Sequence, residues 1–127
     1  MPLGEFELIA RFFDRGPARE ALLGIGDDCA LLAPVAPHNV LAVSTDMLVE
    51  GRHFFHDADP VSVGHKSLAV NLSDLAAMGA RPRAFTIALA LPQVDEDWLG
   101  GFCRGLFAIA DRHACELVGG DTTRGPL

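Results

Sequence analysis

The sequence has few basic residues, fewer than a protein that binds a polyanion would need. Its 127 residues include 10 Lys and Arg against 17 Asp and Glu, which gives a formal net charge of -7 at pH 7. Without a local basic patch, which the sequence does not contain, such a chain is repelled by nucleic acids and by anionic membranes. We therefore expect neither as a partner. If the protein handles phosphates, metal cations have to lie between its own carboxylates and the substrate.

Paired cysteines and long apolar runs are also missing. Cys29, Cys103 and Cys115 form no CxxC pair and no metal-ligand spacing, and an odd number in a short chain argues against a disulfide scaffold. Nothing approaches the roughly 20 apolar residues of a membrane span. Glu5 and Glu7 stand where a signal peptide would need basic residues. The sequence therefore predicts reduced cysteines and a cytoplasmic location.

What is present is enough apolar material for one domain, since half of the residues are hydrophobic. Apolar residues at helical spacing predict helices over 5–15, over 59–79 and from about 95 onward. Short apolar runs predict strands at 29–32, 40–43, 84–91 and 117–118. This order predicts an α/β or α+β domain, with a mixed β-sheet of about four strands and helices packed on one face.

Acidic residues recur where a predicted strand or helix meets a loop. They lie in Gly24-Ile25-Gly26-Asp27-Asp28, Ser44-Thr45-Asp46, Asn71-Leu72-Ser73-Asp74 and Gly119-Gly120-Asp121. Glycine lets a backbone approach a ligand closely, and loops beyond strand ends are where α/β sheets tend to bind one. Carboxylate and hydroxyl oxygens suit Mg²⁺, which keeps other positions for water and substrate phosphates. The four segments together favour a phosphate-handling site with several magnesium ions.

Taken singly, each acid has a local explanation, because Asp beside Gly is a common turn and Asp near a helix start is a common cap. Asp74 is the sharpest exception. It falls inside a predicted helix, where Asp has poor propensity and cannot act as a terminal cap. At about 100° per residue, Ser67, Asn71 and Asp74 form a narrow polar strip that could face a site. By contrast, residues 95–97 are expected to be a solvated helix start.

Two familiar phosphate motifs are excluded and one metal motif is weak. Gly24-Ile25-Gly26 begins like a dinucleotide fingerprint, but Cys29 replaces its third glycine. Gly64-His65-Lys66-Ser67 lacks the spacing and the upstream glycine of a Walker loop. His53 and His56 have an HxxH spacing without a supporting Cys or Glu for zinc. The aromatic loop that contains them could instead be a substrate wall or ordinary packing.

Taken in order, five segments resemble the thiamine-monophosphate kinase family. They are Gly4-Glu5-Phe6-Glu7-Leu8-Ile9, Gly24-Ile25-Gly26-Asp27-Asp28, Ser44-Thr45-Asp46-Met47-Leu48-Val49, the run from Asn71 to Ala80, and Gly119-Gly120-Asp121-Thr122-Thr123-Arg124-Gly125. The shorter segments recur across a superfamily that includes aminoimidazole ribonucleotide synthetase, selenophosphate synthetase and a carbamoyl-dehydrating hydrogenase maturation factor. The two longer ones favour the thiamine enzyme. The fold expected from this resemblance is the amino-terminal domain of an aminoimidazole ribonucleotide synthetase-like protein.

The resemblance also implies a set of roles. Mg²⁺ ions that bridge the phosphates of ATP would be held by Asp28, Ser44, Thr45, Asp46, Asp74 and Asp121. Gly120 and Asp121 would contact the nucleotide, His53 would contact thiamine phosphate, and Asp27 would orient its neighbour. The implied reaction is direct in-line transfer of the γ-phosphoryl of ATP to thiamine phosphate, giving thiamine diphosphate. Because the acceptor is already an anion, we predict no catalytic general base.

In this family two amino-terminal domains pair their sheets in a homodimer, and a second domain follows in the chain. Residues 1–127 are therefore expected to be the ATP- and magnesium-binding domain of a longer protein, with little activity alone. Two alternatives remain: another ATP-dependent enzyme of the same superfamily, and a non-catalytic nucleotide- or Mg²⁺-binding module.

Overall fold

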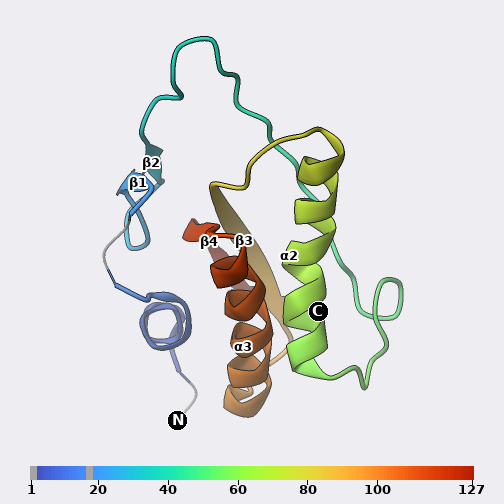
Figure 1. Ribbon diagram of the computed structural model, residues 1–127. Helices are drawn as coiled ribbons and strands as arrows, with labels where there is room; N and C mark the ends of the chain where they lie inside the picture. The colour runs from blue at the N-terminus through green and yellow to red at the C-terminus, as the bar shows by residue number, and fades with distance from the viewer. Residues whose placement is uncertain (1–2, 17–18) are drawn as a thin grey trace.

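The computed structural model describes residues 3–16 and 19–127 (Figure 1). Pro17, expected to help end the first helix, lies outside these residues. In chain order the elements are α1 (Glu5–Leu8), a turn of π-helix (Ile9–Phe13), β1 (Ala21–Leu23), β2 (Leu31–Leu32), α2 (Pro60–Ala77), β3 (Ala84–Leu91), α3 (Glu96–Arg112) and β4 (Glu116–Arg124). The α/β class expected from the sequence is confirmed.

The first helix is shorter than its apolar spacing predicts. It extends only to Phe13, and its last turn widens so that the amide of Asp14 donates to the carbonyl of Ile9 at 2.9 Å. Leu8 and Phe13 are buried and belong to the main hydrophobic core. The wider turn is compatible with this packing while the polar Asp14 stays exposed.

Helices α2 and α3 begin where their sequence signals indicate. Asp59 accepts a hydrogen bond from the Val61 amide at 3.2 Å, with Pro60 as the first helical residue. Asp95 accepts from the Trp98 amide at 3.1 Å and caps α3. The interpretation of residues 95–97 as a helix start is therefore confirmed.

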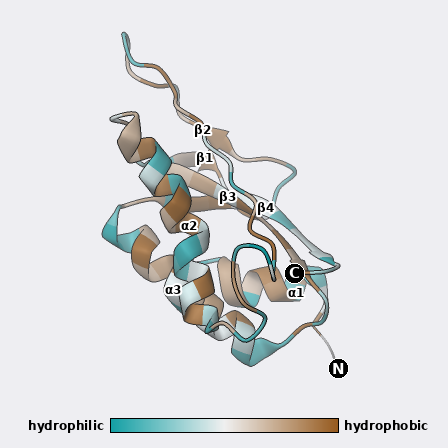
Figure 2. Cartoon of the chain, turned by 90° about the vertical axis from the view of Figure 1, so that its right-hand side faces the viewer, coloured by the Kyte–Doolittle hydropathy of each residue, from teal (hydrophilic) through white to brown (hydrophobic). Residues whose placement is uncertain are grey.

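Strands β3 and β4 are parallel, and α3 is the crossover between them (Figure 1). Their register runs from Ala84 opposite Glu116 to Leu91 opposite Arg124, with an irregularity at Phe85. Helices α2 and α3 lie together on one face of this sheet in both views (Figures 1 and 2). Figure 2 shows brown apolar and teal polar bands alternating along both helices, as expected for amphipathic helices that cover a sheet.

The two helices cross at glycines. A Cβ on Gly64 would lie 2.0 Å from the carbonyl oxygen of Phe102, and one on Gly105 would lie 1.9 Å from that of Val61. The missing side chains let the two backbones touch. On α3, Leu106 next to this crossing and Leu99 two turns earlier are almost wholly buried. Each such side chain contributes roughly 1.5–3 kcal/mol by burial.

The sequence predicts one sheet of about four strands, but the strands of the structure form more than one sheet. The described residues contain two sheets of two strands, an antiparallel β1–β2 pair and the parallel β3–β4 pair. β1 was missed because three residues are too few to show an alternating pattern. Only Leu31–Leu32 of the predicted strand at 29–32 is a strand.

The predicted strand at 40–43 is absent. These residues belong to no strand or helix, and Val40 and Val43 are 90% and 82% exposed. A strand needs a neighbour for its backbone hydrogen bonds, and the part of the chain described here places none beside this segment. None of the helices in the described residues is long and apolar enough to cross a membrane.

Candidate functional site

The predicted acidic segment 24–28 forms the turn between β1 and β2. Gly26 has φ of 106°, a conformation that favours glycine. The Asp28 amide donates to Oδ1 of Asp27 at 3.1 Å, and both side chains are exposed. This hydrogen bond joins the Asp27 side chain to the backbone of Asp28.

The segment 44–46 lies against helix α2. The half-buried Ser44 hydroxyl donates to Oδ1 of Asn71 at 3.2 Å, and Nδ2 of Asn71 donates to the Ser67 carbonyl at 3.2 Å. Thr45 and Asp46 are exposed. The polar strip predicted on α2 therefore has a partner from another part of the chain, and two of the four predicted segments are in contact.

Asp74 lies one turn beyond Asn71 in the last turn of α2 and is exposed. A carboxylate there faces the negative end of the helix dipole, which is unfavourable unless a cation is nearby. The last turn of α2 contains no basic residue. Among residues 3–16 and 19–127, no ion pair is formed by Asp28, Asp46, Asp74 or Asp121.

Residues 119–121 lie inside β4, whereas the sequence predicted that they follow a strand end. Gly120 has φ of 145°, and a Cβ on it would lie 1.8 Å from the carbonyl oxygen of Ile87. Two adjacent glycines usually signal a strand end, but the pairing of β4 with β3 continues past Gly119 and Gly120, with Asp121 opposite Ala88. Gly120 is therefore needed for strand contact, and the exposed Asp121 is held in a fixed register.

His53 lies in a tight turn before α2. Its Nδ1 accepts a hydrogen bond from the Val49 amide at 2.9 Å, and its own amide donates to the Val49 carbonyl at 2.8 Å. The Lys66 ammonium of α2 donates to the His53 carbonyl. The Nδ1 acceptor role requires the tautomer with its proton on Nε2, which leaves that N–H as the outward donor of the exposed ring.

A second histidine strengthens the same turn. His56 Nδ1 pairs with the carboxylate of Glu50, whose amide donates to the carbonyl of Leu127 at 3.2 Å. The hydrogen bond that the His56 ring donates to Glu50, then the charge of Glu50, and to a lesser degree the charge of Asp57 raise the pKa of His56 above 6.5. The sequence did not predict this pair, because nothing in the spacing of residues 50 and 56 indicates a contact.

The described residues contain no group of three or more His, Cys, Asp or Glu side chains placed to hold a metal ion. The predicted aspartates are thus not gathered into a protein-only cage. Mg²⁺ does not require one, because it is usually held by one or two carboxylates together with substrate phosphates and water. Exposed carboxylates without ion pairs, beside hydroxyls, fit that mode of binding.

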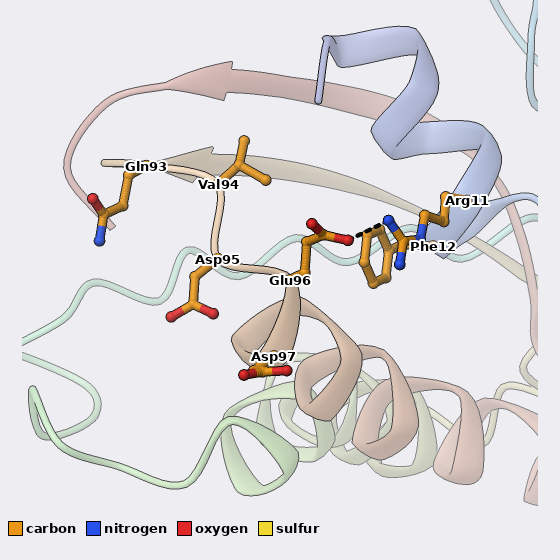
Figure 3. Close-up of a pocket in the computed structure, with 7 residues that line it drawn as sticks. All are labelled: Arg11, Phe12, Gln93, Val94, Asp95, Glu96 and Asp97. Carbon is orange, nitrogen blue, oxygen red and sulfur yellow. Dashed lines mark ion pairs between the residues drawn. The ribbon is translucent and has the colours of Figure 1, made fainter. Parts of the chain in front are cut away.

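Neither of two pockets on the molecule is lined by the predicted aspartates. Figure 3 shows a shallow one of about 630 Å³ at the start of α3, where Arg11 pairs with Glu96 beside Asp95 and Asp97. It contains none of the predicted site residues. A second, of about 560 Å³, lies between the first helix, the β1–β2 turn and the end of α3. It is lined in part by Gly24, Ile25, Arg15, Phe107, Asp111 and Cys115.

Charged and apolar contacts close one side of the second pocket. Arg15 makes two 2.9 Å hydrogen bonds to Asp111 and stacks over Phe107 at 4.4 Å. The guanidinium hydrogen bond lowers the pKa of Asp111. Burial raises the pKa of Cys115 to about 11, so this thiol stays protonated.

Comparison with known proteins shows close relatives along the whole chain. It is 56% identical over 129 residues to the thiamine-monophosphate kinases of Salmonella typhimurium and Escherichia coli K12, covering 100% of this chain and 39% of each relative. The chain therefore spans well under half the length of these relatives. The resemblance to thiamine-monophosphate kinases seen in the sequence motifs is confirmed.

Solved structures agree. The thiamine-monophosphate kinase of Stenotrophomonas maltophilia matches with a TM-score of 0.77 and 53% identity, over 94% of this chain and 37% of the other. That of Aquifex aeolicus matches with a TM-score of 0.61 and 34% identity, over 63% and 28%. The family model described as AIR synthase related protein, N-terminal domain, matches residues 26–127. The chain therefore belongs to the family of AIR synthase related proteins and contains their N-terminal domain.

Proposed function

We propose that residues 1–127 are the ATP- and magnesium-binding domain of an enzyme that phosphorylates thiamine phosphate to thiamine diphosphate. The observation that carries this proposal is the 56% identity to thiamine-monophosphate kinases over the entire chain. Most of the predicted metal and nucleotide residues also lie in the segments whose order resembles the pattern of this family. The proposal places the reaction in the cytoplasm, where ATP is available.

The hydrogen bonds and ion pairs of the structure bear most directly on the proposed metal site. The proposed Mg²⁺ ligands are Asp28, Ser44, Thr45, Asp46, Asp74 and Asp121, with Gly120 and Asp121 also beside the nucleotide. The hydrogen bond from Ser44 to Asn71 brings the second segment to the helix that carries Asp74. The absence of basic partners for these aspartates, within the described residues, leaves their charge available for cations.

The proposed reaction is a single in-line displacement. A non-bridging oxygen of thiamine phosphate forms a bond to the γ-phosphorus of ATP. The bond from that phosphorus to the β,γ-bridging oxygen breaks, and ADP leaves with the electron pair. Mg²⁺ held by the proposed carboxylate and hydroxyl ligands would offset the charge of the two anionic groups. In this proposal the aspartates would orient the ions, and the Nε2–H of His53, whose Nδ1 accepts from the Val49 amide, would donate to the phosphate of the acceptor. No side chain has to remove a proton.

A homodimer through the amino-terminal sheets is part of this proposal. Strands β1 and β2 expose Leu22 and Leu31 to 71% and 50%, and residues 40–43, which follow them in the chain, expose Val40 and Val43 to 90% and 82%. Exposed apolar residues on a two-stranded sheet are typical of a surface that pairs with another chain.

The full-length protein that carries these residues should be assayed for ADP release from ATP and Mg²⁺, with and without thiamine phosphate. Release that depends on thiamine phosphate, with thiamine diphosphate as the product, is the expected result. ATP turnover that is independent of thiamine phosphate would instead indicate a related ATP-dependent enzyme. Tight ATP binding without turnover would indicate a binding module.

A further inference from the structure

The hairpin formed by β1, its turn and β2, residues 19–33, takes no part in the main hydrophobic core. None of these residues, all of which the structure describes, belongs to that core. The four leucines of β1 and β2 are all exposed. Apolar packing against the core therefore does not set where the hairpin lies, although its turn carries Asp28, a proposed Mg²⁺ ligand.

Glu116, the first residue of β4, holds the chain where it enters the hairpin. Its Oε1 accepts a hydrogen bond from the Arg19 amide at 2.7 Å, and its Oε2 accepts one from the Glu20 amide at 2.5 Å. The Glu116 side chain is half-buried, and β1 begins at the next residue, Ala21. Two backbone donors on one ionised carboxylate form strong hydrogen bonds that fix both the position and the direction of the entering chain.

Arg83, which directly precedes β3, holds both ends of the hairpin at once. Its Nε donates to the Glu20 carboxylate at 3.2 Å, and its Nη2 donates at 2.6 Å to the carbonyl of Ala33, the residue after β2. Only 16% of the Arg83 side chain is exposed. Because a guanidinium is planar and presents its donors in a fixed fork, one rigid group sets the spacing between the two ends.

The two holding residues are joined to each other at the start of the parallel sheet. The Glu116 amide donates to the Arg83 carbonyl at 3.2 Å, where the pairing of β3 with β4 begins. Strand β4 also carries Asp121 in a fixed register opposite Ala88. Arg83 and Glu116 therefore connect the hairpin that carries Asp28 to the strand that carries Asp121.

We propose that Arg83 and Glu116 are positioning residues, which hold Asp28 at a set place relative to Asp121 so that both serve one Mg²⁺ site. This inference rests on the proposed function and adds to it two residues that are not themselves ligands. Mg²⁺ demands close to ideal ligand geometry, so a hairpin that shifts by about an ångström would weaken Mg²⁺ binding although its carboxylate is unchanged.

Hydrogen exchange of the full-length protein tests the holding contacts without relying on activity. Arg83→Lys keeps the positive charge but replaces the fork by a single ammonium. Peptides that cover residues 19–33 should exchange faster in this variant, whereas peptides from α2 and α3 should exchange as in wild type. The matched control is Arg11→Lys, because Arg11 also pairs with a carboxylate of another element, Glu96 of α3. It should leave exchange of residues 19–33 unchanged.

Calorimetric titration with ATP at a series of Mg²⁺ concentrations tests the functional role of these contacts. In Arg83→Lys the Mg²⁺ concentration that gives half-maximal ATP binding should rise about tenfold, and saturating Mg²⁺ should restore binding. Glu116→Gln should change both measurements in the same direction. Its amide group keeps one acceptor oxygen but sets an NH₂ donor against the second backbone amide. Arg11→Lys should bind as wild type does.

The outcomes separate this inference from the proposed function. If wild type shows no Mg²⁺-dependent ATP binding, the proposed function fails and the positioning role fails with it. If wild type binds, unchanged exchange of residues 19–33 in the variants would overturn the inference. Faster exchange or lower melting temperature with the Mg²⁺ dependence of wild type would also overturn it, since the contacts would then serve stability only. If Arg83→Lys does not fold, Glu116→Gln decides.

Discussion

Asp74 carries its charge at the unfavourable end of α2. The helix ends at Ala77 and has no basic residue in its last turn, so nothing on the helix itself offsets the carboxylate. Asn71, one turn earlier, is engaged by Ser44 from the segment 44–46. A cation at the proposed metal site would offset this unfavourable charge.

Replacing Asp74 by Asn should leave the fold intact or slightly more stable, because it removes a charge that opposes the helix dipole. If Asp74 is the proposed Mg²⁺ ligand, Mg²⁺-dependent ATP binding should weaken by about tenfold or more, because one of its few carboxylate ligands is lost. Calorimetric titration with ATP at fixed Mg²⁺ measures the change. The control is Asp97→Asn, an exposed helical aspartate outside the proposed site, which should bind as wild type does. Equal binding by the two variants would remove Asp74 from the metal site.

His56 should titrate above its ordinary value of 6.5, because the carboxylate of Glu50 accepts a hydrogen bond from its ring and stabilises the charged form. A histidine with a raised folded-state pKa stabilises the fold fully below the unfolded value and loses that contribution as pH rises through the folded value. NMR titration of the imidazole protons should show the pKa falling toward 6.5 in Glu50→Gln. Asp57→Asn should lower it less, because its charge is the weaker cause. A His56 pKa that does not respond to Glu50→Gln would show that the pair is not formed in solution.

At the scale of elements, the crossing of α2 and α3 depends on glycine. Gly105→Ala would put a Cβ 1.9 Å from the carbonyl oxygen of Val61, so the helices would have to separate. We expect destabilisation by about 3 kcal/mol. Gly100→Ala, on the same helix, meets only the flexible Arg104 side chain at 3.6 Å and should stabilise by about 0.5–1 kcal/mol. Urea denaturation of both variants measures the difference, and similar midpoints would contradict the close crossing.

The elements that the sequence predicts well are those whose signals are local. Asp59–Pro60 and Asp95 mark helix starts by cap chemistry, and the strand 84–91 matches β3 residue for residue. The strand at 40–43 is wrong because apolar content alone does not supply a hydrogen-bonding neighbour. The two glycines at 119 and 120 predict a strand end, whereas β4 continues past them because its pairing with β3 determines where it ends.

The candidate site shows the same limit. The motifs name Asp28, Asp46, Asp74 and Asp121, and the polar strip on α2 anticipates that Asn71 faces another group. The contacts that hold the His53 turn could not be foreseen. They join His53 to Lys66, Glu50 to Leu127 and His56 to Glu50, and no spacing in the sequence encodes these pairs.

At the scale of the whole molecule, the proposed homodimer predicts a molar mass in solution of two chains. Light scattering after size exclusion of these 127 residues should give about twice the 13.5 kDa of one chain at high concentration. Paired Val40→Asp and Val43→Asp changes should shift the mass toward one chain, because charges would enter the proposed apolar contact. Phe6→Ser, an equally exposed apolar residue on α1, should leave the mass unchanged. A single-chain mass for the unaltered domain at every concentration would argue against pairing through this surface.

Transfer of the γ-phosphoryl group tests the central claim most directly. The full-length protein would be incubated with Mg²⁺, thiamine phosphate and ATP labelled in its γ-phosphoryl group, and the products separated. The account predicts label in the terminal phosphoryl of thiamine diphosphate, in an amount equal to the ADP formed. Label that appears only in inorganic phosphate, at a rate that thiamine phosphate does not change, would contradict it.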